Sequence, residues 1–318
     1  MVEISVSVLT DYARGLIDSI TGFHLLFYLD NDEQQTVVQH QARPNAERTV
    51  LQKRRERSGS NRPTVVTSAD EVAPRVKAWI RVVQCAGINI LIAVVLQVLS
   101  YLLPKIGSFL TEAPTNGVAN FVSVAGIFPI YVFSRIVNAL WFSDIAGACK
   151  RALKIQECRP VDFRNFISDF INAILLEFFF LLQSAAVMHI PIPVVAPVLS
   201  FVHLTLLHSM YCFEYYWMDR REMLNARVAI MQASWVYFVG FGTPLTVAAW
   251  LAPNFIVGGC VFGALFPLFI ISSFKAASKR SGAFSTSCHV PSLRVFYPSS
   301  MLTDGIATFL ARHILSQR

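Results

Sequence analysis

The sequence predicts an all-α integral membrane protein with about six apolar helical segments. Three observations favour this class. Hydrophobic residues make up 54% of the 318 residues and charged residues 15%, whereas a soluble domain has about 25% charged residues. The apolar residues gather in runs of about twenty, the length that crosses a hydrocarbon core of about 30 Å. Lysine and arginine alternate between rich and poor connectors along the chain.

An amphipathic helix is predicted in residues 1–30, ahead of the first apolar run. Its apolar residues recur at spacings of three and four: Leu9, Tyr12, Ala13, Leu16, Ile17, Ile20, Phe23 and Phe27. Asp11, Arg14, Asp18 and Ser19 interrupt that pattern, so this segment is too polar to span a bilayer. We expect it to lie at the interface on the cytoplasmic leaflet, and packing on the helical bundle or on a partner is the alternative.

Residues 31–78 are predicted to form a disordered basic linker. The segment is polar and rich in charge, with scattered prolines. Its densest basic run contains Lys53, Arg54, Arg55 and Arg57, which we expect to contact anionic lipid headgroups at the membrane surface. Nucleic acid is not an expected partner, because no aromatic residues alternate with these basic ones and no known reader motif accompanies them.

The multi-pass membrane domain is predicted over residues 79–275. Its six apolar runs are Val83–Leu103, Phe121–Phe142, Ile167–Ile190, Val194–Trp217, Ser234–Ala252 and Asn254–Phe274. The links HIPIPVVAP and LAPN are so short that they predict two tight hairpins of antiparallel helices. Pro244 and Pro267 interrupt the second hairpin. Each hairpin either crosses the bilayer or enters it only part-way, so the number of complete crossings stays open.

The connectors predict the sidedness of the chain. Eleven Lys and Arg precede the first run, and the following connectors carry one (104–120), five (143–166), none (191–193), three (218–233) and none (Pro253), with six from Lys275 onward. Basic residues collect on the cytoplasmic side of membrane proteins. Both termini are therefore expected in the cytoplasm, and residues 276–318 form a cytoplasmic C-terminal tail.

Three polar residues are predicted inside the membrane: Arg135, Glu177 and His208. Helical rise places them roughly 10, 15 and 14 Å from the cytoplasmic ends of their runs. A lone charge at the bilayer centre costs about 2.5–3.5 kcal/mol on insertion scales, so such groups face protein and pair. We expect Arg135 to pair with Glu177, with His208 nearby, as a structural clamp or as part of an ion or proton path.

An acidic residue at the end of the fourth run and a pair of glycines in the sixth run are further candidate site residues. In YCFEYYWMDRREM, Glu214 sits among aromatic residues at the cytoplasmic end of the fourth run. Aromatic residues favour this level of the membrane, and Glu214 is expected to reach water or to pair with a basic neighbour. Gly259 and Gly263 have the spacing of a close helix–helix contact.

Enzymatic activity is not expected. Hydrolase, metalloprotease, P-loop and dinucleotide-binding motifs are missing, and no cofactor or metal is expected. The six cysteines are scattered without C-x-x-C pairs, and they are expected to act as small hydrophobic residues.

Five motifs resemble the etoposide-induced protein 2.4 family of endoplasmic-reticulum membrane proteins, which is distantly similar to bacterial sulfate permeases. They are DYARGLIDSITG, VNALWFSDIA, YCFEYYW, YFVGFGTPL and GCVFGALFPLFIIS, in matching order over most of residues 9–274. Asp144 and Glu214 fall within these motifs. The permease resemblance implies hairpins that enter the membrane only part-way.

The resemblance implies a multi-pass protein of the reticulum membrane that autophagosomes need in order to mature into degradative autolysosomes. It also implies links to growth suppression and apoptosis. Such a protein would act through contacts with lipid and with membrane or autophagy proteins not yet identified. The alternative is an anion transporter or channel for sulfate-like ions, favoured by the intramembrane Arg135 and by the prolines inside the runs.

Overall fold

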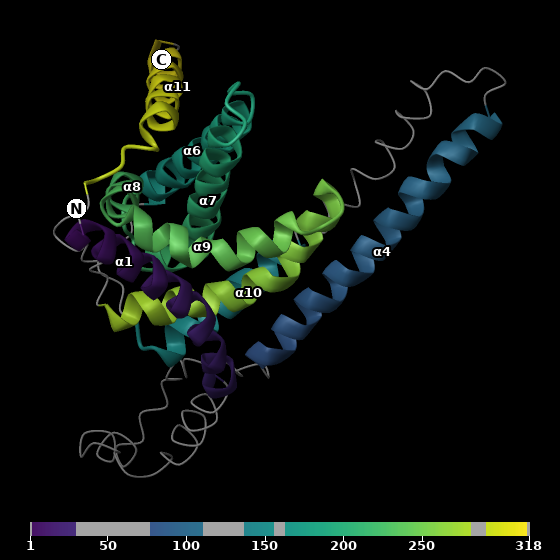
Figure 1. The fold of residues 1–318 in the computed structure, drawn as a ribbon, viewed down its shortest axis with the longest axis horizontal. Helices are drawn as coiled ribbons and strands as arrows, with labels where there is room; N and C mark the ends of the chain where they lie inside the picture. The colour runs from purple at the N-terminus through teal and green to yellow at the C-terminus, as the bar shows by residue number, and fades with distance from the viewer. Residues whose placement is uncertain (1, 30–76, 111–136, 156–162, 281–290, 317–318) are drawn as a thin grey trace, which may run out of the picture.

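The computed structural model describes residues 2–29, 77–110, 137–155, 163–280 and 291–316 (Figure 1). These residues are helical, with no β-strand among them, which confirms the predicted all-α class. The labelled elements are α1 (Val2–Thr21), η1 (Gly22–Leu25), α4 (Ala78–Leu110), α6 (Phe163–Val187), α7 (Val195–Asp219), α8 (Leu224–Ala233), α9 (Trp235–Trp250), α10 (Phe255–Lys279) and α11 (Tyr297–Ser316). A further helix covers residues 137–152.

Three of the described helices are long and apolar enough to cross a membrane. They are α4 over Ala78–Leu99, α7 over Val195–Asp219 and α10 over Ile256–Lys279. The pair α8 and α9 is apolar enough together, but its two helices meet at 94°, so it is either a broken span or a re-entrant loop. The apolar part of α6 covers only 171–187, and most of the predicted run 121–142 lies outside the described residues.

Both predicted hairpins are present, and they point in different directions. In Figure 1 the α6/α7 hairpin rises while the α9/α10 hairpin extends sideways beside α4. The second hairpin turns at Asn254, whose side-chain oxygen accepts a hydrogen bond from the Val257 N–H at 2.9 Å. This bond satisfies one of the free N–H groups at the start of α10. Pro244 and Pro267 lie inside α9 and α10.

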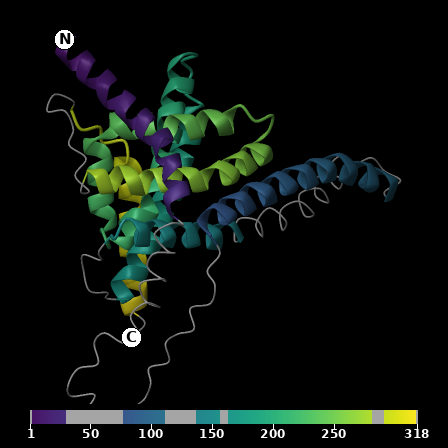
Figure 2. The ribbon, with the colours of Figure 1, turned by 90° about the horizontal axis from the view of Figure 1, so that it is seen from below.

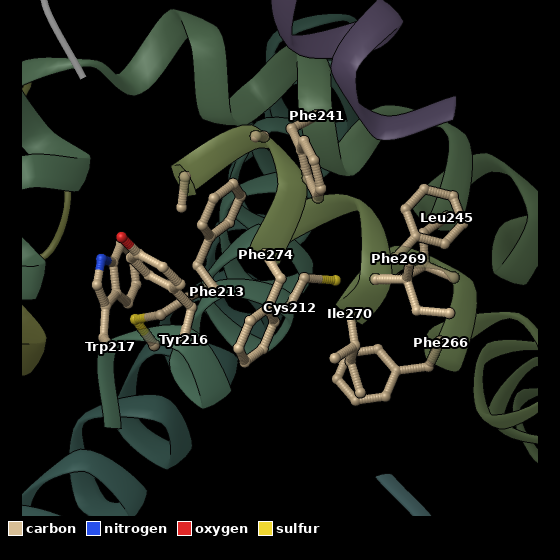
Figure 3. Packing of buried hydrophobic residues seen from close by; sticks show 14 of the residues in the cluster. Cys212, Phe213, Tyr216, Trp217, Phe241, Leu245, Phe266, Phe269, Ile270 and Phe274 are labelled. Carbon is tan, nitrogen blue, oxygen red and sulfur yellow. The ribbon is translucent and has the colours of Figure 1, made fainter. Parts of the chain in front are cut away.

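Aromatic rings fill the space where α7, α9 and α10 meet (Figure 3). The ring of Phe213 lies 4.8 Å from that of Phe241 and 5.6 Å from that of Trp217. The Tyr216 and Phe274 rings meet edge to face at 5.6 Å. Such contacts add about 0.5–1.5 kcal/mol per pair beyond burial. The aromatic residues that the sequence placed at the end of the fourth run therefore hold this junction together.

The N-terminal helix α1 packs on α9 and α10 (Figures 1 and 2). Gly15 and Gly240 make the approach possible, because a Cβ atom on Gly15 would overlap the Tyr237 carbonyl and one on Gly240 would overlap the Tyr12 carbonyl. Packing on the bundle, the alternative to a free interfacial helix, is therefore what the structure shows. Contact of α1 with the leaflet stays a prediction.

The C-terminal segment returns to α6 and docks there. The rings of Phe296 and Phe180 stack at 4.2 Å, and the Ser299 hydroxyl donates to Gln183 Oε1 at 2.8 Å. The Gln183 amide donates in turn to the Val295 carbonyl at 3.0 Å. The tail predicted from residue 276 onward thus contains a helix, α11, that is part of the folded bundle.

Candidate functional site

A buried arginine joins three helices beside the aromatic junction. Arg227 lies on α8, and its side chain is only 6% exposed. Its Nη2 donates to Asp169 Oδ2 on α6 at 2.9 Å, and its Nη1 donates to Glu214 Oε1 on α7 at 3.3 Å. Its Nε donates to the Glu222 carbonyl at 2.8 Å. The planar guanidinium suits this role because its donors point in several fixed directions.

Asp169 has a second role at the start of α8. Its Oδ1 accepts a hydrogen bond from the Leu224 N–H at 2.8 Å, and Leu224 is the first residue of that helix. The first N–H groups of a helix have no partner within it, so a carboxylate is stabilising at this position. Asp169 thereby fixes both the beginning of α8 and the guanidinium of Arg227.

Glu177 adds a third carboxyl group. It lies two turns along α6 from Asp169, close to the carboxyl group of Glu214 and the guanidinium of Arg227. We name the group of Asp169, Glu177, Glu214 and Arg227 the Arg227 cluster.

The predicted partner of Glu177, Arg135, lies outside the described residues, so that pairing stays a prediction. The described charges beside Glu177 are Glu214 and Arg227. Sequence reasoning counted Arg227 only as a connector charge and overlooked Asp169. The available signal was the short α7/α8 turn, which folds Arg227 back beside the end of α7.

His208 occupies the apolar interior between α7, α9 and α10. Its Nδ1 lies 2.7 Å from the hydroxyl of Thr246, and its ring lies 5.0 Å from that of Phe262. The Thr246 hydroxyl donates to the Gly242 carbonyl at 2.8 Å, so it accepts from His208 Nδ1. The structure thus gives His208 a hydroxyl on α9 as its hydrogen-bond partner.

The other predicted residues fall at helix contacts. Asp144 pairs with Arg81 at 3.1 Å on a partly exposed surface. Gly263 packs against α4, where a Cβ atom would come within 2.5 Å of the Asn89 side chain. Asn89 and Asn138 exchange amide hydrogen bonds of 3.0 and 3.1 Å beside it.

The remaining predicted residues are Gly259 and the basic residues of the linker. Gly259 is half-buried, and its role in packing stays a prediction. The basic residues Lys53, Arg54, Arg55 and Arg57 lie outside the described part of the chain. Within the described ranges, no group of three or more His, Cys, Asp or Glu side chains is arranged to hold a metal ion.

Comparison with known proteins decides the family. The family described as "Sulfate transporter CysZ/Etoposide-induced protein 2.4" matches residues 71–272, a span that contains the whole Arg227 cluster. The chain belongs to this family. The predicted resemblance is thereby confirmed, and the CysZ/Etoposide-induced protein 2.4 family makes this a multi-pass membrane protein whose helices contact the lipid bilayer.

Relatives of this CysZ/Etoposide-induced protein 2.4 family member include proteins of an animal, an amoeba and a plant. The chain is 33% identical to "Ectopic P granules protein 4" of Caenorhabditis elegans, over 94% of this chain and 91% of that protein. It is 29% identical to "Protein EI24 homolog" of Dictyostelium discoideum, over 61% of this chain and 64% of that protein. The homolog in Arabidopsis thaliana is 28% identical, over 50% and 56%. No solved structure matches significantly.

Proposed function

We propose that this protein acts in the endoplasmic-reticulum membrane and is required for autophagosomes to mature into degradative autolysosomes. The observation that carries the proposal is the 33% identity to "Ectopic P granules protein 4" over 94% of this chain. That name describes P granules found out of place, which fits a relative that helps to remove cytoplasmic material. The links to growth suppression and apoptosis belong to the same proposal.

Contacts with proteins and lipids, rather than turnover of a substrate, are the proposed mode of action. Two basic connectors come together at one end of the bundle, where Lys150 pairs with Asp219 at 3.5 Å. The N-terminal helix joins the end of α10 through Asp18 and Arg280 at 3.0 Å. These charged ends would face the cytoplasm in the proposed topology and would present a rigid surface to autophagy proteins.

Removal of the protein from cells tests the proposal. We expect immature autophagic structures and undegraded cargo to accumulate, and turnover by the proteasome to stay unchanged. Re-expression of the wild-type chain should restore lysosomal degradation of the cargo. Normal autophagic flux without the protein would overturn this function.

Anion transport is the second candidate, favoured by the family description, which includes a sulfate transporter. Liposomes containing the purified protein should then take up sulfate, and Arg135→Gln should abolish the uptake. Arg312→Gln, on the C-terminal helix, is the matched control and should leave it unchanged. Vesicles that stay impermeable to sulfate around folded protein would exclude this candidate.

A further inference from the structure

The amphipathic helix α1 turns its small and polar residues toward the protein and its large apolar residues outward. Asp11, Gly15, Ser19 and Gly22 are buried against the protein. The residues of α1 facing outward are large and apolar, with Val6, Leu9, Ile17 and Ile20 exposed by 59, 69, 56 and 50%. A surface helix of a soluble protein shows the opposite arrangement, with its apolar stripe toward the core.

Specific contacts hold α1 in this orientation. The Tyr12 hydroxyl donates to Thr243 at 3.1 Å, and the Tyr237 hydroxyl donates to Asp18 at 3.1 Å. Arg280 also donates to Asp18, at 3.0 Å, and its guanidinium lies 4.2 Å from the Tyr237 ring. Rotation of α1 about its axis would break these bonds, so the outward apolar face is a fixed feature of the fold.

Two polar residues beside the outward face have partners within α1. The Thr10 hydroxyl donates to the Val6 carbonyl at 2.7 Å, and Arg14 pairs with Asp11 at 3.4 Å. Polar groups that leave water need such partners, because hydrocarbon offers none. The Thr10 hydroxyl therefore needs no water, whereas the Arg14 side chain is 57% exposed and keeps a charged end at the surface.

The position of α1 indicates what that surrounding is. The helix covers α9 and α10, and α10 is long and apolar enough to cross the membrane. On the membrane helix α4, residues such as Val83, Ile90 and Leu91 are likewise exposed, by 59, 62 and 61%. In lipid, helices associate through small residues and turn large apolar ones outward, which is the pattern of α1.

We propose that the outward face of α1 (Val6, Leu9, Ile17 and Ile20) contacts lipid acyl chains, so that α1 is an embedded part of the membrane domain. This contact extends the lipid-facing surface of the spans to the N-terminal helix. It does not depend on the proposed role in autophagy, because it rests only on the orientation of α1 against membrane helices.

Photocrosslinking of the full-length protein in phosphatidylcholine vesicles tests the proposal. p-Benzoylphenylalanine is placed singly at Leu9, Ile17 or Leu91, where an exposed side chain leaves room for it, and at Tyr12, where it resembles the native ring. We expect lipid adducts at Leu9 and Ile17 in a yield comparable with Leu91 on α4. The Tyr12 position should instead form a cross-link to α9 within the same chain.

Mass spectrometry separates the outcomes. A cross-link between two chains at Leu9 or Ile17 would overturn the proposal, since a second copy would then cover the face. Unreacted probe at both positions, with lipid adducts at Leu91, would overturn it as well, because the face would then border water. Adducts at Leu9 and Ile17 support it whether or not the protein acts in autophagy.

Discussion

At the scale of single residues, Arg227 is the charge on which the junction of α6, α7 and α8 depends. Its guanidinium binds carboxylates from two other helices and the carbonyl of Glu222. Removing one partner of a buried ion pair leaves the other charge uncompensated, which lowers the free energy of unfolding by about 3–5 kcal/mol. The surrounding carboxyl groups make the loss of Arg227 more severe than the loss of any one of them.

We expect Arg227→Leu to lower the free energy of unfolding by about 3–5 kcal/mol and to reduce the abundance of the protein. Glu177→Gln should leave stability nearly unchanged, because Asp169 and Glu214 hold the Arg227 guanidinium. Thermal unfolding in detergent, followed by size-exclusion chromatography, measures both.

Arg220→Leu is the matched control. Arg220 donates to the Tyr216 hydroxyl at 3.2 Å and pairs with Glu222 at 3.9 Å. Both charged side chains are about a quarter exposed or more, and such exposed pairs contribute about 0–1 kcal/mol. Equal losses for Arg220→Leu and Arg227→Leu would show that the Arg227 cluster has no special role in stability.

At the scale of elements, close backbone contact decides which helices pack together. Gly15 and Gly240 bring α1 against α9, and Gly242 brings α9 against the Thr205 carbonyl of α7. Close packing of backbone and hydrogen bonds add to the apolar contacts between these helices, as in other membrane proteins.

Gly15→Leu and Gly240→Leu should each displace α1 from α9. The added side chain meets backbone that cannot move aside, and overpacking of this kind costs about 1–3 kcal/mol or more. A cross-link from p-benzoylphenylalanine at Tyr12 to α9 reports the contact, because the Tyr12 side chain reaches Thr243 in the wild type. We expect it to form readily in the parent and poorly in both variants.

Gly87→Leu provides the control for size alone. No atom lies within 4 Å of a Cβ placed at Gly87 on α4, so the larger side chain has room there. If Gly15→Leu preserves the cross-link as well as Gly87→Leu does, the glycine contact is not what positions α1.

At the scale of the whole molecule, the charged connectors share one end of the bundle. Lys150 and Asp219 lie 3.5 Å apart although they come from different connectors, 143–166 and 218–233. A bilayer cannot separate two groups in contact. The pairing therefore agrees with the positive-inside pattern, which predicts both connectors in the cytoplasm.

If the protein inserts in the reticulum membrane as proposed, a glycosylation acceptor inserted after Lys154 should remain unmodified, because the glycosylating enzyme works only on the luminal side. The same acceptor in the 104–120 connector, which is predicted to be luminal, should be modified and serves as the control. Band shifts removed by glycosidase measure both. Modification after Lys154 would reverse the predicted sidedness.

Much of this protein follows from its sequence alone. The helical membrane class, the two hairpins and the family are evident because hydropathy, short proline-containing links and motif order are properties of neighbouring residues. The same local signals predicted a basic neighbour or water for Glu214, but they could not select Arg227, which approaches it only because α8 folds back on α7.

Tertiary structure decided which way the helices face. The periodicity of α1 marks an apolar and a polar side, yet in a membrane protein both the interior and the lipid are apolar. A local pattern therefore cannot tell inside from outside, and only the packing on α9 shows that Gly15 points inward and Ile17 outward. The docking of α11 on α6 could not be predicted from local patterns either. Ser299 and Gln183 are 116 residues apart in the sequence and meet only when the chain has folded.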